Sequence, residues 1–119
     1  MVAAPRLRIR LQFDEGSRLG PGKADLLESI GATGSISAAG REMKMSYTRA
    51  WALVEQMNDS FAEPLVASAR GGAKGGGAQL TEAGKAVLAE FRALEAAAQA
   101  AGDAHIAAIT ALRKEAPDA

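Results

Sequence analysis

The chemistry that this sequence could perform is concentrated first in a glycine-rich stretch with one lysine, RGGAKGGGAQL at residues 70–80. Such loops can cradle phosphate groups, and the nucleotide-binding version continues with Ser or Thr and then a helix. Here Lys74 is followed by Gly75, and a strand-like segment comes before any helix. The pattern therefore favours a β-hairpin with a cationic tip over a nucleotide cradle. Arg70 and Lys74 could then reach phosphates or a minor groove, while glycine N–H groups approach the backbone.

A second group of polar side chains lies on a predicted helix at residues 47–58. Thr48, Arg49 and Gln56 lie opposite its apolar stripe and carry the donors that recognise base edges in a major groove. Ser46, the expected N-cap, could bind a phosphate together with the helix N-terminus. The hydroxyl of Tyr47 could do the same, whereas Trp51 is expected to anchor packing. The alternative is an ordinary helical hairpin with a solvated polar face.

Groups needed for catalysis or metal binding are missing from the sequence. It has no cysteine and one histidine, and no nucleophile–base pair or nucleotide fingerprint is evident. We therefore predict no catalytic residue, no metal and no cofactor, and an enzyme ranks last among the possible functions. The predicted DNA-binding residues are Ser46, Tyr47, Thr48, Arg49, Gln56, Arg70, Lys74 and Gly75.

Two short helices joined by a tight turn must position the polar face. Residues 36–43 form the first, capped by Ser35, and residues 47–58 form the second. Gly40 supplies a small residue where two steeply crossing helices touch. Lys44 occupies the turn position that is often glycine, so positive φ is expected there. The pair is typical of a helix-turn-helix.

The flanking segments predict one more helix and a small sheet. Residues 23–30 form a helix that Gly31 can close in a left-handed conformation. Residues 65–69 and 78–80 are two strands around the glycine loop, which makes the hairpin a wing. Residues 6–13 alternate apolar and polar side chains, so they predict a half-buried strand available as a third strand of the wing. Its three arginines either face solvent or contact DNA or a partner.

A long helix completes the chain. Thr81 is its expected N-cap, and small and apolar residues then recur in steps of four and three, with His105 in the same row. Gly102 and Asp103 could interrupt it. The predicted fold class is mainly α with a small β-sheet: a winged helix-turn-helix at residues 1–80, followed by a C-terminal dimerisation helix at 81–119.

Composition sets broader limits. The 119 residues suit one domain with an appended helix. The 14 basic and 14 acidic side chains balance, which counts against a strongly basic nucleic-acid binder and requires any steering charge to be local. The N-terminus lacks the apolar run of a membrane anchor. Together with the absence of cysteine, this predicts a cytoplasmic protein with no membrane partner.

Several of these motifs in combination resemble a known family. The segment GSISAAGREMKMSYTRAWALVEQMN at 34–58, the glycine wing and the start of the helix after Leu80 are similar to the N-terminal DNA-binding domain of the molybdate-responsive transcriptional regulators, the ModE family. The resemblance covers residues 7–94. It implies a winged helix that dimerises and contacts DNA through its recognition helix and wing. Members that sense molybdate carry C-terminal oxyanion-binding domains. This chain ends at Ala119, so direct molybdate binding is not expected.

Two interpretations of function remain. The first is a sequence-specific DNA-binding transcriptional regulator that acts as a homodimer, with the recognition helix in the major groove and the wing on the backbone or minor groove of double-stranded DNA. The second is a winged-helix adapter that dimerises and binds proteins without binding DNA. Arg49, Arg70 and Lys74 favour the first, whereas the neutral net charge leaves room for the second.

Overall fold

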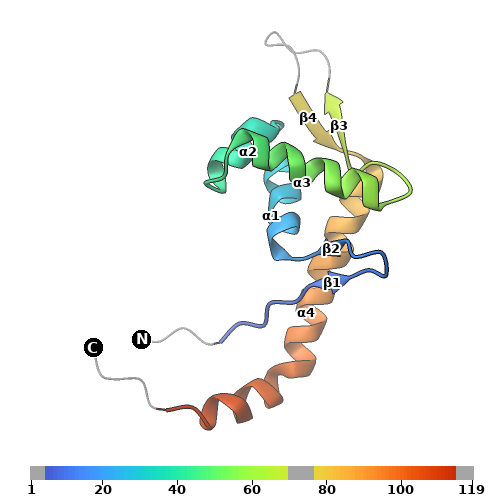
Figure 1. The fold of residues 1–119 in the computed structure, drawn as a ribbon. Coiled ribbons are helices and arrows are strands. Elements are labelled where there is room, and N and C mark those ends of the chain that lie inside the picture. The colour runs from blue at the N-terminus through green and yellow to red at the C-terminus, as the bar shows by residue number, and fades with distance from the viewer. Residues whose placement is uncertain (1–4, 70–76, 115–119) are drawn as a thin grey trace.

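The computed structural model describes residues 5–69 and 77–114. Helices make up most of this part of the chain and two small antiparallel sheets complete it, which confirms the predicted winged helix-turn-helix with a long C-terminal helix. Figure 1 shows the shorter helices gathered beside the upper part of the longest one, with one hairpin projecting above them. The elements are β1 (Leu11–Gln12), β2 (Arg18–Leu19), α1 (Pro21–Thr33), α2 (Ile36–Glu42), α3 (Tyr47–Ser60), β3 (Val66–Ala69), β4 (Gly77–Leu80) and α4 (Glu82–Ala111).

Helices α2, α3 and α4 begin where the sequence predicts. The side-chain oxygens of Ser35, Ser46 and Thr81 each accept the backbone N–H three residues further on. Such a bond satisfies an amide that has no partner inside the helix and is worth about 1 kcal/mol. The three predicted N-caps are confirmed.

The core that fixes these helices combines α1, α2, α3 and the β3–β4 hairpin. The predicted apolar stripe of α3 is buried in it and consists of Ala50, Leu53, Val54 and Met57. The buried members of this core are Leu26, Leu27, Ile30, Ile36, Ala39, Ala50, Leu53, Val54, Met57, Leu65, Val66 and Ala78. Since one stripe of α3 is held against this core, its remaining faces are left to solvent or to a partner.

The contact between α2 and α3 has the geometry that Gly40 predicts. A Cβ built on Gly40 would lie 3.1 Å from the Cβ of Ala50, so a larger residue would push the helices apart. The turn between them places Lys44 at φ 59°, as expected for a position that is often glycine. Met45 then donates its N–H to the Gly40 carbonyl oxygen at 2.9 Å.

Helix α1 is longer than predicted, and Gly31 does not close it. The helix begins at Pro21, whose missing N–H costs nothing in a first turn, and it ends at Gly34 with φ 72°. Gly34 donates its N–H to the Ile30 carbonyl oxygen at 2.8 Å, which closes the last turn. Gly31 instead lies inside the helix, where a Cβ would meet the Leu80 side chain at 3.4 Å.

The N-terminal strand does not join the wing. Only Leu11–Gln12 is extended as a paired strand, and it pairs antiparallel with β2 in a separate hairpin that turns at Gly16 with φ 98°. A turn of a few residues closes locally at lower entropic cost than pairing with a strand far along the chain. A second small core holds the hairpin in place. Its buried members are Leu19, Ala24 and Phe91, packed against Ile9, Phe13, Phe61, Val87 and Leu88.

Helix α4 is continuous from Glu82 to Ala111, so Gly102 and Asp103 do not interrupt it. Its first turns belong to the domain: Phe91 is buried in the second core, and a Cβ on Gly84 would lie 2.1 Å from the Leu65 carbonyl oxygen. Further along, Ile109 is exposed. The apolar row of α4 is therefore divided between packing inside the chain and an exposed outer part.

Candidate nucleic-acid interface

Helix α3 presents three different surfaces outside its buried stripe. Thr48, Glu55 and Asp59 are exposed and share the side directly opposite the stripe, because they recur at helical spacing. The two flanks between this side and the core face different neighbours, namely the β3–β4 hairpin on one side and the β1–β2 hairpin on the other. The predicted binding residues are distributed over all three.

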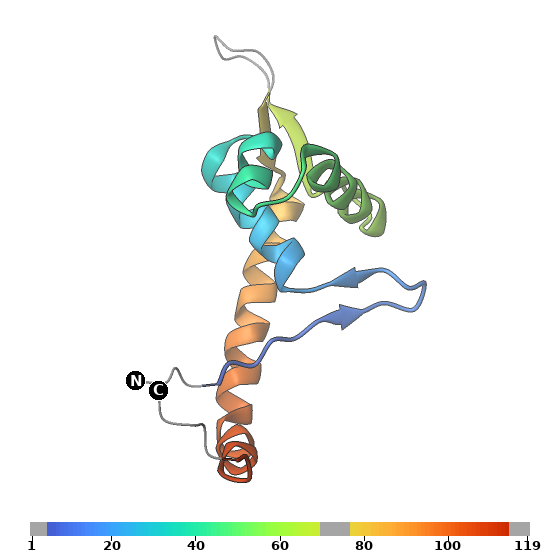
Figure 2. The same cartoon turned by 60° about the vertical axis from the view of Figure 1, so that its left-hand side comes forward.

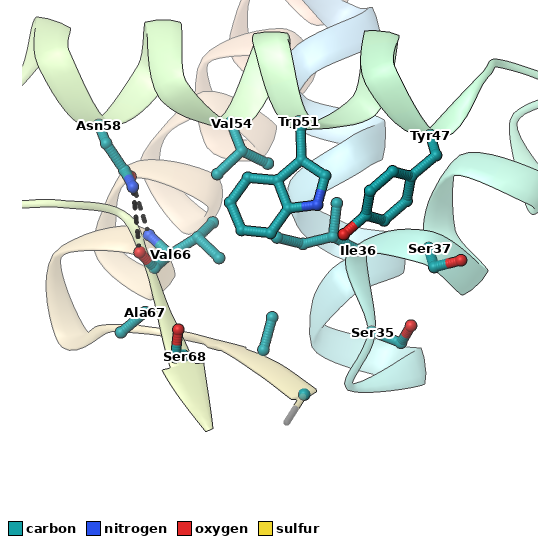
Figure 3. A pocket seen from close by; sticks show the side chains of 12 residues that line it. Ser35, Ile36, Ser37, Tyr47, Trp51, Val54, Asn58, Val66, Ala67 and Ser68 are labelled. Carbon is teal, nitrogen blue, oxygen red and sulfur yellow. Dashed lines mark hydrogen bonds between the residues drawn. The ribbon is translucent and has the colours of Figure 1, made fainter. Parts of the chain in front are cut away.

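On the wing side, Tyr47, Trp51 and Asn58 line a cleft of about 430 Å³ between α3, the start of α2 and the two wing strands. Figure 3 shows both aromatic side chains directed into this cleft from the helix above it. Their rings meet edge to face with centroids 6.2 Å apart. The cleft therefore has aromatic side chains on the α3 side and serine side chains at the start of α2.

The prediction that Trp51 anchors the core is wrong. Its side chain is 36% exposed and that of Tyr47 is 57% exposed, and neither belongs to the buried clusters. The physical reason is the position of Trp51 on the helix. It lies next to Val54 on the side that faces the wing, so the indole is directed over the cleft and not into the buried stripe. Trp51 therefore lines the cleft and does not anchor the core.

Asn58 connects the recognition helix to the wing, a role that the sequence analysis did not predict. Its Oδ1 accepts the Leu65 N–H at 2.8 Å. Figure 3 shows its two bonds to Val66: Oδ1 accepts the Val66 N–H at 3.1 Å, and Nδ2 donates to the Val66 carbonyl oxygen at 3.1 Å. An asparagine near a helix end, a few residues before a strand, was the available signal, because its amide both donates and accepts. These bonds fix the start of β3 against α3.

Arg49 and Gln56 lie on the opposite flank, where both are exposed and face the β1–β2 hairpin across a separate cleft. At the N-terminus of α3, the Oγ of Ser46 accepts the Arg49 N–H at 3.0 Å. The first turn of α3 thus brings Ser46, Thr48 and Arg49 together at an exposed, electropositive helix end. The wing residues Arg70, Lys74 and Gly75 lie outside the described residues, and the strands predicted on either side of them are present as β3 and β4.

An ion-pair cluster that the sequence analysis did not predict ties α1 to α4. The Arg92 guanidinium lies 2.7 Å from Asp25, 3.2 Å from Glu28 and 2.9 Å from Glu95. The hydrogen bond to Asp25 and the neighbouring carboxylates raise the pKa of Arg92. The two acidic residues of α1 are thereby engaged on the α4 side, away from α3.

Residues 5–69 and 77–114 contain no group of three or more His, Cys, Asp and Glu side chains placed to hold a metal ion. Within the same ranges no helix combines the length and the apolar character required to span a bilayer.

Comparison with known proteins gives one family match and several relatives. The family model of bacterial regulatory helix-turn-helix proteins of the lysR family matches residues 23–85, which include most of α1 and all of α2, α3 and the wing strands. The Molybdenum-pterin-binding protein MopB of Rhodobacter capsulatus is 51% identical over 81 residues, covering 68% of this chain and 30% of that protein.

Two further relatives carry names that point to regulation or transport. The Molybdenum transport protein ModE of Azotobacter vinelandii is 42% identical over 96 residues, covering 81% of this chain and 36% of that protein. The DNA-binding transcriptional dual regulator ModE of Escherichia coli is 36% identical over 83 residues, covering 70% and 32%. The chain spans about a third of the length of these relatives. The resemblance noted from the motifs is confirmed.

Proposed function

We propose that this chain, which belongs to the lysR family of bacterial regulatory helix-turn-helix proteins, binds double-stranded DNA in a sequence-specific manner and regulates transcription. One observation carries the proposal. The start of α3 exposes Ser46, Thr48 and Arg49 together, while the buried stripe of the same helix is fixed on α1 and α2. A helix held in this way can enter a major groove with its N-terminal residues against base edges.

The side chains of that first turn divide into two tasks. Arg49 carries a planar fork of donors suited to a guanine edge, and Thr48 can bond to several bases. The Ser46 hydroxyl and the amides at the helix end suit a phosphate, because the helix dipole favours negative charge there. Gln56, two turns further along the Arg49 flank, is assigned to base discrimination at the edge of the site.

The wing forms the second part of the proposed interface. Arg70 and Lys74 are assigned to the sugar–phosphate backbone or the minor groove, with Gly75 allowing close approach. The proposal is supported by the hydrogen bonds from Asn58 of α3 to Leu65 and Val66, which hold the wing strands and the recognition helix as one unit. Two basic side chains in the loop between these strands then add salt-dependent affinity.

We further propose that the protein acts as a homodimer through α4. Beyond Phe91 the apolar side chains Leu94, Ile109 and Leu112 are exposed by 39%, 64% and 87%. A long helix that carries such a row past the domain offers a seam for a second copy. Two recognition helices could then reach successive major grooves, roughly 34 Å apart, on an inverted repeat.

Selection of random duplexes on the purified protein tests this function. A palindromic winner is expected, with affinity that falls steeply with salt, and sedimentation should give twice the mass of one chain. Arg49→Ala should weaken the winner by about 1–3 kcal/mol and relax the preference at one base pair of each half-site.

Lys85→Ala is the matched control, because it removes an equal charge from an exposed ion pair with Glu82 on α4. This variant should bind like the wild type. Failure to enrich any duplex would refute the proposed function, and equal effects of Arg49→Ala and Lys85→Ala would remove Arg49 from the interface.

A further inference from the structure

A basic cleft of about 550 Å³ lies between the β1–β2 hairpin, the start of α1 and α3. Four cations line it: Arg10, Arg18, Lys23 and Arg49. Gln56 completes its polar lining, and no carboxylate belongs to the lining in the part of the chain that the structure describes. The cleft thus gathers more than a quarter of the 14 basic residues of a chain whose net charge is zero.

Local packing brings these cations together from three elements. The stem of Arg10 crosses Gly20, where a built Cβ would lie 3.1 Å from the Arg10 Cγ, so the absence of a side chain makes room for the arginine. Lys23, in the first turn of α1, donates from Nζ to the Arg18 carbonyl oxygen at 2.8 Å. Arg49 approaches from the first turn of α3.

None of these four cations forms an ion pair within residues 5–69 and 77–114. Asp25 and Glu28 of α1 are engaged by Arg92 on the side of α4, and Glu15 in the hairpin turn accepts a hydrogen bond from Ser17. Burial lowers the pKa of Lys23, and the charges of Arg18 and Arg49 lower it further. An anion in the cleft would relieve this repulsion.

The position of the cleft beside α3 indicates which anion it would bind. Figure 2 shows the β1–β2 hairpin (blue) and α3 (green) projecting from the same side of α4. Arg49 and Gln56 belong both to the cleft and to the exposed surface of the recognition helix, so a duplex on α3 would pass the cleft on the side opposite the wing strands. We propose that the basic cleft binds the sugar–phosphate backbone of the duplex that α3 reads, at a phosphate flanking the groove.

This inference rests on the proposed function and makes the N-terminal hairpin a second backbone contact besides the wing. Phosphate contacts fix the register of a helix in the groove without reading sequence. The hairpin would therefore add affinity equally for all sequences. Its contribution would differ from that of Thr48 and Arg49, which discriminate between bases.

The test is a salt titration of duplex binding by Arg18→Gln, using the selected duplex and a scrambled one. Each lost phosphate contact lowers the slope of log K against log salt by about 0.9. We expect that loss for both duplexes, which corresponds to roughly eight-fold weaker binding near 0.1 M salt. Arg18 is exposed, so the thermal unfolding midpoint should stay unchanged. Arg18→Lys, which keeps the charge, should keep the slope.

Arg8→Gln is the matched control. It removes the same charge from the same N-terminal segment, but Arg8 is exposed and lines a different cleft beside Arg92 and Asp25. If the wild type binds duplex and Arg18→Gln keeps the slope of Arg8→Gln, the proposed role of the cleft is refuted while the proposed function stands. If the wild type binds no duplex, the function itself fails.

Inorganic phosphate separates the backbone from a free anion as the ligand. Its titration is followed through the backbone amide NMR signals of residues 18–20, 22 and 23. We expect only weak, non-saturating shifts, because one free ion does not replace a polyanion. Saturable phosphate binding that Arg18→Gln abolishes, with an unchanged slope for the duplex, would assign the cleft to a small anion and overturn the proposal.

Discussion

Helix α4 closely approaches the start of the wing at one of its glycines but not at another. Replacing these two glycines by alanine should therefore change the stability of the protein in opposite directions. A Cβ on Gly84 would lie 2.1 Å from the Leu65 carbonyl oxygen, a backbone atom that no rotamer change can move. A Cβ on Gly102 would meet the side chains of Ile106 at 3.6 Å and Leu7 at 4.0 Å, which are ordinary contacts. Gly84→Ala and Gly102→Ala therefore make the same chemical change in the same helix with different neighbours.

The magnitudes follow from three effects. Alanine is better than glycine inside a helix by about 1 kcal/mol, and this gain applies to both variants. At Gly84 overpacking costs about 3 kcal/mol, at the upper end of the usual range, because backbone must move. That movement also strains the bonds from the Thr81 N–H to Leu65 at 3.0 Å and from its hydroxyl to Pro64 at 2.7 Å. We expect Gly84→Ala to destabilise the protein by about 2–4 kcal/mol and Gly102→Ala to stabilise it by up to about 1 kcal/mol.

Urea unfolding followed by circular dichroism measures both changes, and an equal slope with denaturant would show that the same surface is exposed in each case. The wild type and Gly102→Ala should also bind DNA alike, since Gly102 lies far along α4 from the wing. Equal stabilisation by the two substitutions would refute the reasoning, because it would mean that no backbone lies against Gly84.

Two other predictions test the surroundings of α3. Asn58→Ala removes three hydrogen bonds to Leu65 and Val66 and should lower the free energy of unfolding by about 2–3 kcal/mol. Gln56→Ala, on the exposed flank of the same helix, should change it by less than about 0.5 kcal/mol. Equal values for the two variants in urea unfolding would contradict the role given to Asn58. The lowered pKa of Lys23 predicts a pH dependence, because the folded state releases this proton at lower pH than the unfolded state. The stability of the wild type relative to Lys23→Gln should therefore rise with pH through the folded pKa and level off near the ordinary value of 10.5, and a difference that falls with pH would contradict the assignment.

The features that the sequence predicted correctly are those whose cause is local. Ser35, Ser46 and Thr81 cap helices because a hydroxyl and an amide three residues apart meet whatever the rest of the chain does. Lys44 adopts positive φ because the turn between two steeply crossing helices requires it. The stripe of α3 followed from its period, and the motif combination at 34–58 pointed to the ModE regulators, to which the chain is similar.

The errors concern contacts between residues far apart in the sequence. Alternation at residues 6–13 indicated a strand but carried no information about its partner, and the strand paired with β2 instead of the wing. Helical spacing placed Trp51 at the edge of the apolar stripe of α3, but it did not show that a cleft, and not the core, lies beneath the side chain. The cluster around Arg92 joins residues up to 67 positions apart, a pairing that charge patterning along one helix cannot predict.

Phe61 connects the packing of the recognition helix to that of the N-terminal hairpin. It follows the last residue of α3 and packs against both buried clusters, the one that fixes the recognition helix and the one that fixes the N-terminal hairpin. Its ring meets Phe13 edge to face with centroids 6.1 Å apart. Because Arg10 precedes β1 and Phe13 follows it directly, this aromatic contact helps set the distance between the hairpin cations and Arg49. If the basic cleft fits a phosphate, its width depends on apolar packing at the far end of α3, not on the charged groups, which repel one another.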